Sequence, residues 1–301
     1  MTADPLPTQP PHAAACPNCG APADRNFCPE CGQARGRDLR LPFLPLAAEA
    51  VQETVGLESR LAGTFGRLLL HPGEVTVDYL GGRRARYTTH LRTYLVASLA
   101  FFFVSALHPE RVGVVVAMPG RGSVVVVAPS RDAVLTPSAK EARDLDETER
   151  KLRARGRLGA AVASRLHALR LLPPDEARRR VGAELTQAMP RVAFFLVPLL
   201  AAMLHLAFRR SGQFYAEHLV FALHANAVSF ALLLPGAIAA SDWLTALGGL
   251  ASTGHAVVAL RRVHGTSWGA TLVRALPVAV GYPLLLSLAV VGVGLVALFF
   301  G

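Results

Sequence analysis

Five apolar stretches constrain the fold of this chain more than any other feature of its sequence. They lie at residues 91–107, 192–208, 219–240, 243–260 and 276–300. A helix needs about 17–25 mostly apolar residues to cross the hydrocarbon core of a bilayer. The sequence therefore predicts an all-α integral membrane bundle of about five transmembrane helices.

The composition supports lipid as the solvent for much of the chain. Of the 301 residues, 52% are hydrophobic and 17% are charged, whereas soluble domains carry about 25% charged residues. The formal net charge is +10, and nearly all of the base is arginine. A basic balance fits either nucleic acid or an anionic membrane surface. Because the arginines stand mainly beside the apolar stretches and in one long loop, we expect a lipid bilayer rather than nucleic acid as the partner.

The region before the first span divides into three segments. Residues 1–15 are polar and Pro-rich, which predicts a disordered lead, and they lack the basic start and apolar run of a signal peptide. Residues 16–33 contain all four cysteines. Residues 34–90 combine a linker with an amphipathic helix over 43–70, which lies either on the membrane surface or against the bundle. The His71-Pro72-Gly73 sequence is expected to end this helix.

A long segment, residues 108–190, separates the first span from transmembrane helices 2–5 in residues 191–301. Two Val-rich runs around Pro119–Gly122 predict a β-hairpin in this extramembrane loop. Charged, Ala- and Leu-rich sequence predicts helices over 138–172 and 175–188.

The arginines near the spans predict the topology. They form three groups, at residues 83–92, 209–210 and 261–274. With five spans, all three groups fall on one side of the membrane, which the positive-inside rule assigns to the cytoplasm. We therefore expect a cytoplasmic N-terminus, a periplasmic C-terminus and an external long loop.

The four cysteines form a metal-binding pattern. Cys16, Cys19, Cys28 and Cys31 are arranged as CxxC, eight intervening residues, and CxxC. The glycine after each pair permits a tight turn, and four thiolates complete a closed tetrahedral site, which is typical of structural zinc. Two reducible CxxC pairs are the alternative. A closed site has no open position for catalysis, so we interpret residues 16–33 as a zinc ribbon that docks a cytoplasmic protein partner.

Polar side chains at the start of the third span form a second candidate site. They are Glu217, His218 and His224, and His205 near the end of the second span could approach them. Ionisable residues inside a membrane suggest function, here metal binding or proton relay. The alternative is structural, because Glu217 and His218 lie near Arg209 and Arg210 and His224 could pair with a neighbouring helix. For His255 and His264 we expect helix packing and an interfacial position, respectively.

The sequence contains no recognisable catalytic constellation. There is no Walker-type loop or HExxH sequence. A docking, scaffold or sensing role is therefore the leading hypothesis. The alternatives are a transporter or membrane enzyme that uses the Glu/His cluster, and nucleic-acid contact by the ribbon.

Several motifs together resemble a known family. They are the CPNCG and CPECG pairs, HPG followed by YLGGRR, and YAEHLVFALH. This pattern is similar to bacterial zinc-ribbon membrane proteins catalogued only as a domain of unknown function. The resemblance implies a bacterial inner-membrane location and an N-terminal zinc ribbon, but no reaction or substrate. It departs from the expected pattern at His264, where we expect a tyrosine.

Overall fold

The computed structural model describes residues 15–22, 27–33, 59–108, 114–115, 126–127, 139–157, 159–161, 163–164, 167 and 174–300. Nearly all of the predicted lead, the linker and the first part of the predicted amphipathic helix lie outside these residues.

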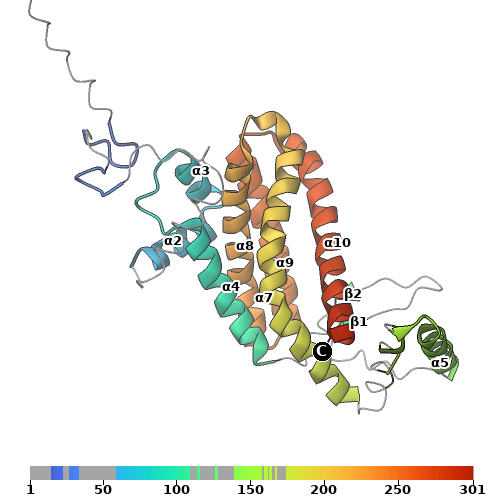
Figure 1. The fold of residues 1–301 in the computed structure, drawn as a ribbon. Helices are drawn as coiled ribbons and strands as arrows, with labels where there is room; N and C mark the ends of the chain where they lie inside the picture. Colours follow the sequence, from blue (N-terminus) through green and yellow to red (C-terminus); the bar gives the residue numbers. More distant parts are fainter. Residues whose placement is uncertain are drawn as a thin grey trace, which may run out of the picture.

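Four helices are long and apolar enough to cross a membrane. Their candidate spans are Leu185–Ala207 within α7 (Pro174–Ala207), Tyr215–Ile238 (α8), Asp242–His264 (α9) and Trp268–Val290 within α10 (Trp268–Phe300). Figure 1 shows these helices side by side as a bundle. Large apolar side chains face outward on it, including Phe195, Trp243 and Val273, each at least 73% exposed. Exposed apolar area of this extent indicates a lipid bilayer around the bundle.

The first predicted span is a shorter helix, so the expectation of about five spans is corrected to four candidates. Helix α4 (His90–Ala106) has 17 residues, about 26 Å at 1.5 Å per residue, against a hydrocarbon core of about 30 Å. It runs alongside α8 in the same direction, because His90 contacts His224 while Phe101 contacts Phe230 further along. It therefore begins level with the third turn of α8, and other elements cover the start of α8.

The second span and the helix predicted before it form one continuous helix. Helix α7 has 34 residues and contains Pro190 and Pro198. The predicted boundary at residue 190 is therefore not a helix end. Prolines are tolerated inside membrane helices because neighbouring groups satisfy the freed backbone carbonyls.

Most of the described residues of the long loop are helical. Helix α5 (Ala139–Arg153) falls within the predicted helical region. Strands β1 (Val114–Val115) and β2 (Val126–Val127) pair antiparallel, two residues on each strand. An extended β-hairpin is not seen there, and most of the Val-rich runs lie outside the described residues. Figure 1 places α5 and the C-terminus at the end of the bundle opposite α3.

Residues 59–89, which we call the platform, cover the start of α8 with two short helices and a turn. Helices α2 (Ser59–Leu70) and α3 (Glu74–Leu80) bury Leu68 and Val75 against Val228 of α8. Two side chains of α9 donate hydrogen bonds to backbone carbonyls of the platform. His255 Nε2 donates to Leu68 O at 2.7 Å, and Arg262 Nη1 donates to Pro72 O at 2.9 Å. The C-terminal part of the predicted amphipathic helix is thus packed on the bundle.

Gly73 allows the platform to approach α9 closely. Its φ is +78°, and an added Cβ would lie 2.9 Å from the carbonyl oxygen of Ala259. Both the left-handed backbone and the close backbone contact therefore require glycine. This position explains the glycine of the HPG sequence.

Replacing Gly73 should separate the platform from α9. We expect Gly73→Ala to destabilise the protein by about 1–3 kcal/mol, because the side chain adds backbone strain and a contact with Ala259. Gly66→Ala in α2 is the matched control: its Cβ would meet nothing within 4 Å, and alanine favours a helix by about 1 kcal/mol. Thermal unfolding in detergent measures both changes, and an equal response of the two variants would contradict this account.

Candidate functional site

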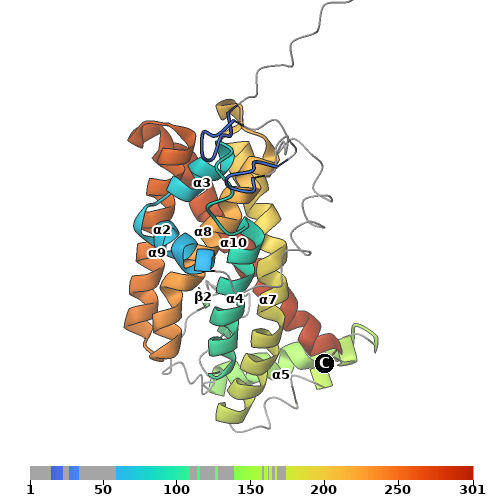
Figure 2. The same cartoon turned by 90° about the vertical axis from the view of Figure 1, so that its left-hand side faces the viewer.

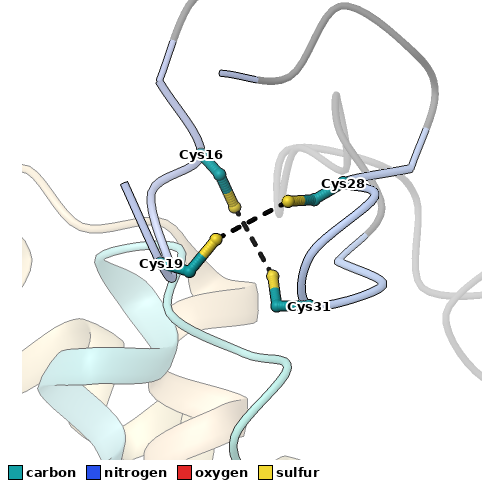
Figure 3. Close-up of side chains that lie close together, drawn as sticks. All are labelled: Cys16, Cys19, Cys28 and Cys31. Atoms are coloured by element: carbon teal, nitrogen blue, oxygen red, sulfur yellow. Dashed lines mark hydrogen bonds between the residues drawn. The ribbon is translucent and has the colours of Figure 1, made fainter. Parts of the chain in front are cut away.

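The four cysteines meet at one point in the N-terminal segment. Their sulfur atoms all lie within 4.8 Å of one another. Cys16 Sγ lies 3.7 Å from Cys31 Sγ, and Cys19 Sγ lies 3.6 Å from Cys28 Sγ. Figure 3 shows the four side chains converging from two turns. This cluster could hold one metal ion, as the spacing predicts.

The two cysteine turns repeat the same backbone pattern. In the first, Gly20 N donates to Cys16 O and Cys16 N donates to Ala21 O, both at 2.8 Å. In the second, Gly32 N donates to Cys28 O at 2.9 Å and Cys28 N donates to Gln33 O at 2.8 Å. Gly20 and Gly32 have φ of +78° and +71°. The predicted role of these glycines in tight turns is confirmed.

The Cys16 and Cys19 thiols differ in how readily they ionise. The backbone N–H of Cys19 lowers the pKa of the Cys16 thiol to about 7. The backbone N–H of Ala21 favours the Cys19 thiolate, yet burial and the neighbouring thiols raise the pKa of Cys19 to about 12. Thiolates are the form that binds metal. A cation among the sulfurs would favour ionisation of Cys19 beside Cys16.

Gln33, directly after the second turn, attaches the cysteine segment to the platform. Its Nε2 donates to Gly82 O, and its Oε1 accepts from Arg84 N at 3.2 Å and Ala85 N at 3.3 Å. The Gln33 side chain is buried, at 8% exposure. Figure 2 shows the cysteine segment, in dark blue, beside α3. One amide thus satisfies three backbone groups of the turn after α3.

The Asp78 carboxylate keeps that turn in shape. Arg83 Nε donates to Oδ1 at 3.0 Å, and Tyr87 OH donates to Oδ2 at 2.6 Å. Burial alone would raise the pKa of Asp78, but the hydrogen bonds from Tyr87 and Arg83 outweigh it and lower that pKa below its ordinary value. The Asp78 carboxylate therefore links both ends of the turn.

His218, one of the predicted site residues, lies in a cluster of three histidines from three helices. Its ring centroid is 5.3 Å from that of His205 on α7 and 5.3 Å from that of His264 on α9. His218 is 1% exposed, and neither of its ring nitrogens has a partner in the structure. His264 Nδ1 lies 3.0 Å from Leu260 O, so Nδ1 carries the proton and Nε2 has a free lone pair.

The remaining predicted residues lie elsewhere. His224 is buried near His90 and Tyr79, and its Nδ1 is 2.9 Å from Thr76 Oγ1 of the platform. Glu217 caps α8, because its Oε2 accepts from Phe214 N at 2.6 Å. The four residues predicted as one site therefore divide among a histidine cluster, a platform contact and a helix cap.

Sequence reasoning missed three contributors. His264 was expected at an interface, and it instead stacks on Phe208 with ring centroids 3.9 Å apart and lies beside His218. Gln33 and Asp78 received no role. A glutamine that follows a cysteine turn and an aspartate that precedes a Gly-Gly-Arg-Arg turn were the available signals.

The Asp78 network should contribute stability that depends on pH. We expect Asp78→Asn to lower stability at pH 7 by about 1–3 kcal/mol, because the buried Tyr87 hydroxyl and the partly exposed Arg83 guanidinium lose an ionised acceptor. The folded pKa of Asp78 lies below the ordinary value of 3.8, so this contribution is complete above that value and is lost as the pH falls through the folded pKa. Thermal unfolding at pH 7 and about pH 3 should show the difference shrinking.

Glu74→Gln is the matched carboxylate-to-amide control for Asp78→Asn. Glu74 pairs with Arg67 at 3.5 Å on the surface, where an ion pair contributes about 0–1 kcal/mol. Equal losses in the two variants at pH 7 would contradict the assignment of Asp78.

Comparison with known proteins places the platform in a recognised family. Residues 58–102 match the family model described as "Protein of unknown function (DUF3667)". Comparisons with curated proteins and with solved structures gave no significant match. The matched segment contains α2, α3, the turn that binds Gln33 and most of α4. The chain therefore contains a segment that matches the DUF3667 family, together with a four-cysteine cluster and membrane-span helices.

Proposed function

We propose that the four-cysteine cluster holds a structural zinc ion. A tetrahedral site with zinc–sulfur bonds of about 2.3 Å has sulfur–sulfur edges of about 3.8 Å. Two of the sulfur pairs lie 3.6 and 3.7 Å apart, and all four sulfurs lie within 4.8 Å of one another, so two edges already match that value and the others need a shift of at most about 1 Å. Cys16, Cys19, Cys28 and Cys31 are the ligands, and the zinc takes no part in a reaction because no coordination position remains open.

We further propose that this is a non-enzymatic bacterial inner-membrane protein whose zinc ribbon docks a cytoplasmic partner. The observation that carries this proposal is the attachment of the ribbon to the membrane domain by Gln33. A ribbon held in one place can present a fixed surface, and Phe27 on it is 59% exposed. An exposed aromatic side chain is a suitable contact for a protein partner.

The contacts at one end of the bundle support the proposed orientation. Arg83 and Arg84 lie in the turn that binds Gln33, and Arg262 binds Pro72 of the same platform. Gln213, which follows Arg209 and Arg210, donates to Val263 O on α9. These arginines thus gather at one end, which we call the basic end. By the positive-inside rule this end is cytoplasmic. With α4 crossing as a fifth, shorter helix, the N-terminal ribbon is then cytoplasmic and the C-terminus periplasmic.

The metal content tests the ribbon directly. Purified wild-type protein in detergent should contain one zinc per chain, and Cys16→Ser should lose it, because three thiolates cannot close the tetrahedral site. Elemental analysis of both proteins, with Ser98→Ala on α4 as a folded control, measures this. Wild-type protein without zinc would contradict the proposal.

Partner docking can be tested at Phe27. A photo-crosslinking amino acid at position 27 should capture a protein in membranes, and a chelator should abolish that capture because the ribbon depends on its metal. The same crosslinker at Leu70, a 77% exposed position of α2 outside the ribbon, should not respond to the chelator. Capture at position 27 that persists without zinc would argue against ribbon docking.

A second candidate function is transport or membrane chemistry at the His205, His218 and His264 cluster. It is favoured by the two unpartnered ring nitrogens of His218, since buried polar groups normally have a partner, an ordered water or an ion. If this function holds, a second metal survives Cys16→Ser and is lost in His218→Leu. Glu217→Gln, which changes only the cap of α8, should retain it.

A further inference from the structure

A hollow of about 330 Å³ opens at the basic end between α7, the short helix η2 (Arg209–Ser211) and α10. It is lined by two apolar side chains, Leu206 and Ala207, and by three arginines, Arg209, Arg210 and Arg274. Its size is within the range of small-ligand sites, about 300–1,000 Å³. The lining combines positive charge with an apolar wall.

The three arginines of the hollow have no acidic counterpart in the described part of the chain. No carboxylate there forms an ion pair with any of them. Arg274 contacts the Phe208 ring, with its guanidinium carbon 5.9 Å from the ring centroid. Arg274 also falls inside the candidate span Trp268–Val290. A charge at membrane depth requires a partner, so an anion has to come from outside the protein.

The position of the hollow indicates where that anion comes from. Trp268, at the start of α10, is 48% exposed. The guanidinium carbon of Arg261 lies 4.6 Å from the centroid of the Trp268 ring, and such Trp and Arg side chains are typical of the membrane interface. Arg274 lies six residues further into α10, about 9 Å along the axis. Val273 and Leu206 beside it are 73% and 70% exposed. The hollow therefore lies at the boundary between apolar chains and headgroups.

We propose that Arg209, Arg210 and Arg274 bind the phosphate of an anionic phospholipid. The planar guanidinium groups can each donate two hydrogen bonds to phosphate oxygens. The acyl chains then lie along Leu206 and Val273, which face the bilayer. A zwitterionic lipid carries the same phosphate together with its own ammonium group, so the excess positive charge of the hollow selects a lipid with net negative charge. The lipid belongs to the leaflet at the basic end.

Lipid retention by purified protein tests this site. Full-length protein in non-ionic detergent is titrated with phosphatidylglycerol, and bound lipid is quantified by native mass spectrometry. We expect Arg274→Gln to weaken binding about fivefold, since each basic residue near a membrane surface contributes about that factor. Removing all three charges should weaken it more than tenfold. Arg274→Lys should bind more tightly than Arg274→Gln.

The controls separate this site from general charge and from free phosphate. Arg86→Gln removes one exposed charge from the basic end without touching the hollow, and it should change binding less than twofold. Arg209→Gln and Arg210→Gln alter exposed positions, so they test the site even if Arg274→Gln fails to fold. Phosphatidylcholine bound as tightly as phosphatidylglycerol, displacement by equimolar inorganic phosphate, or unchanged binding in the triple variant would each overturn the proposal.

Discussion

The buried carboxylate of Asp78 is the interaction on which the basic end depends. It accepts from Arg83 and Tyr87, which both follow the Gly81-Gly82 turn. Without an ionised acceptor, the buried Tyr87 hydroxyl would lose the oxygen to which it donates, a loss of about 1–3 kcal/mol, and the partly exposed Arg83 would lose its ion pair. The turn that Asp78 holds presents the backbone groups that Gln33 binds and leads directly into α4. One carboxylate thus organises the contact of the ribbon and the start of the helix beside α8.

The platform is the part of the membrane domain that both α9 and the ribbon contact. Gly73 brings it against the backbone of α9, and Arg262 and His255 donate to its carbonyls. Helices α2 and α3 cover the start of α8, and α4 begins beside the third turn of α8. Helix α4 is too short to count among the long spans. The same end of the bundle carries arginines that remain without described acidic partners, and these form the proposed lipid site. The segment matched by the family model is therefore the part that joins the ribbon to the bundle.

Local pattern predicted the features that depend on local sequence. Cysteine spacing predicted the four-sulfur cluster, and apolar runs predicted the four candidate spans, with ends that differ by up to ten residues. Tertiary contacts were not predictable in this way. The seven-residue spacing of Glu217 and His224 suggested a shared site. In the structure, Phe214 N donates to the Glu217 carboxylate, and the Thr76 hydroxyl is hydrogen-bonded to the His224 imidazole. The sequence suggested that His205 could approach His218, and their ring centroids lie 5.3 Å apart. Nothing in a single sequence places His264 beside them, because that depends on the rotation of the helices.

The central claim is that the metal-bound ribbon is fixed to the platform through Gln33. Hydrogen exchange at the backbone amides of Arg84 and Ala85, both bonded to Gln33 Oε1, tests it most directly. The account predicts that zinc removal and Gln33→Ala each accelerate exchange at these two amides while exchange in α8 stays unchanged. Exchange at Arg84 and Ala85 that is indifferent to both zinc and Gln33 would contradict it.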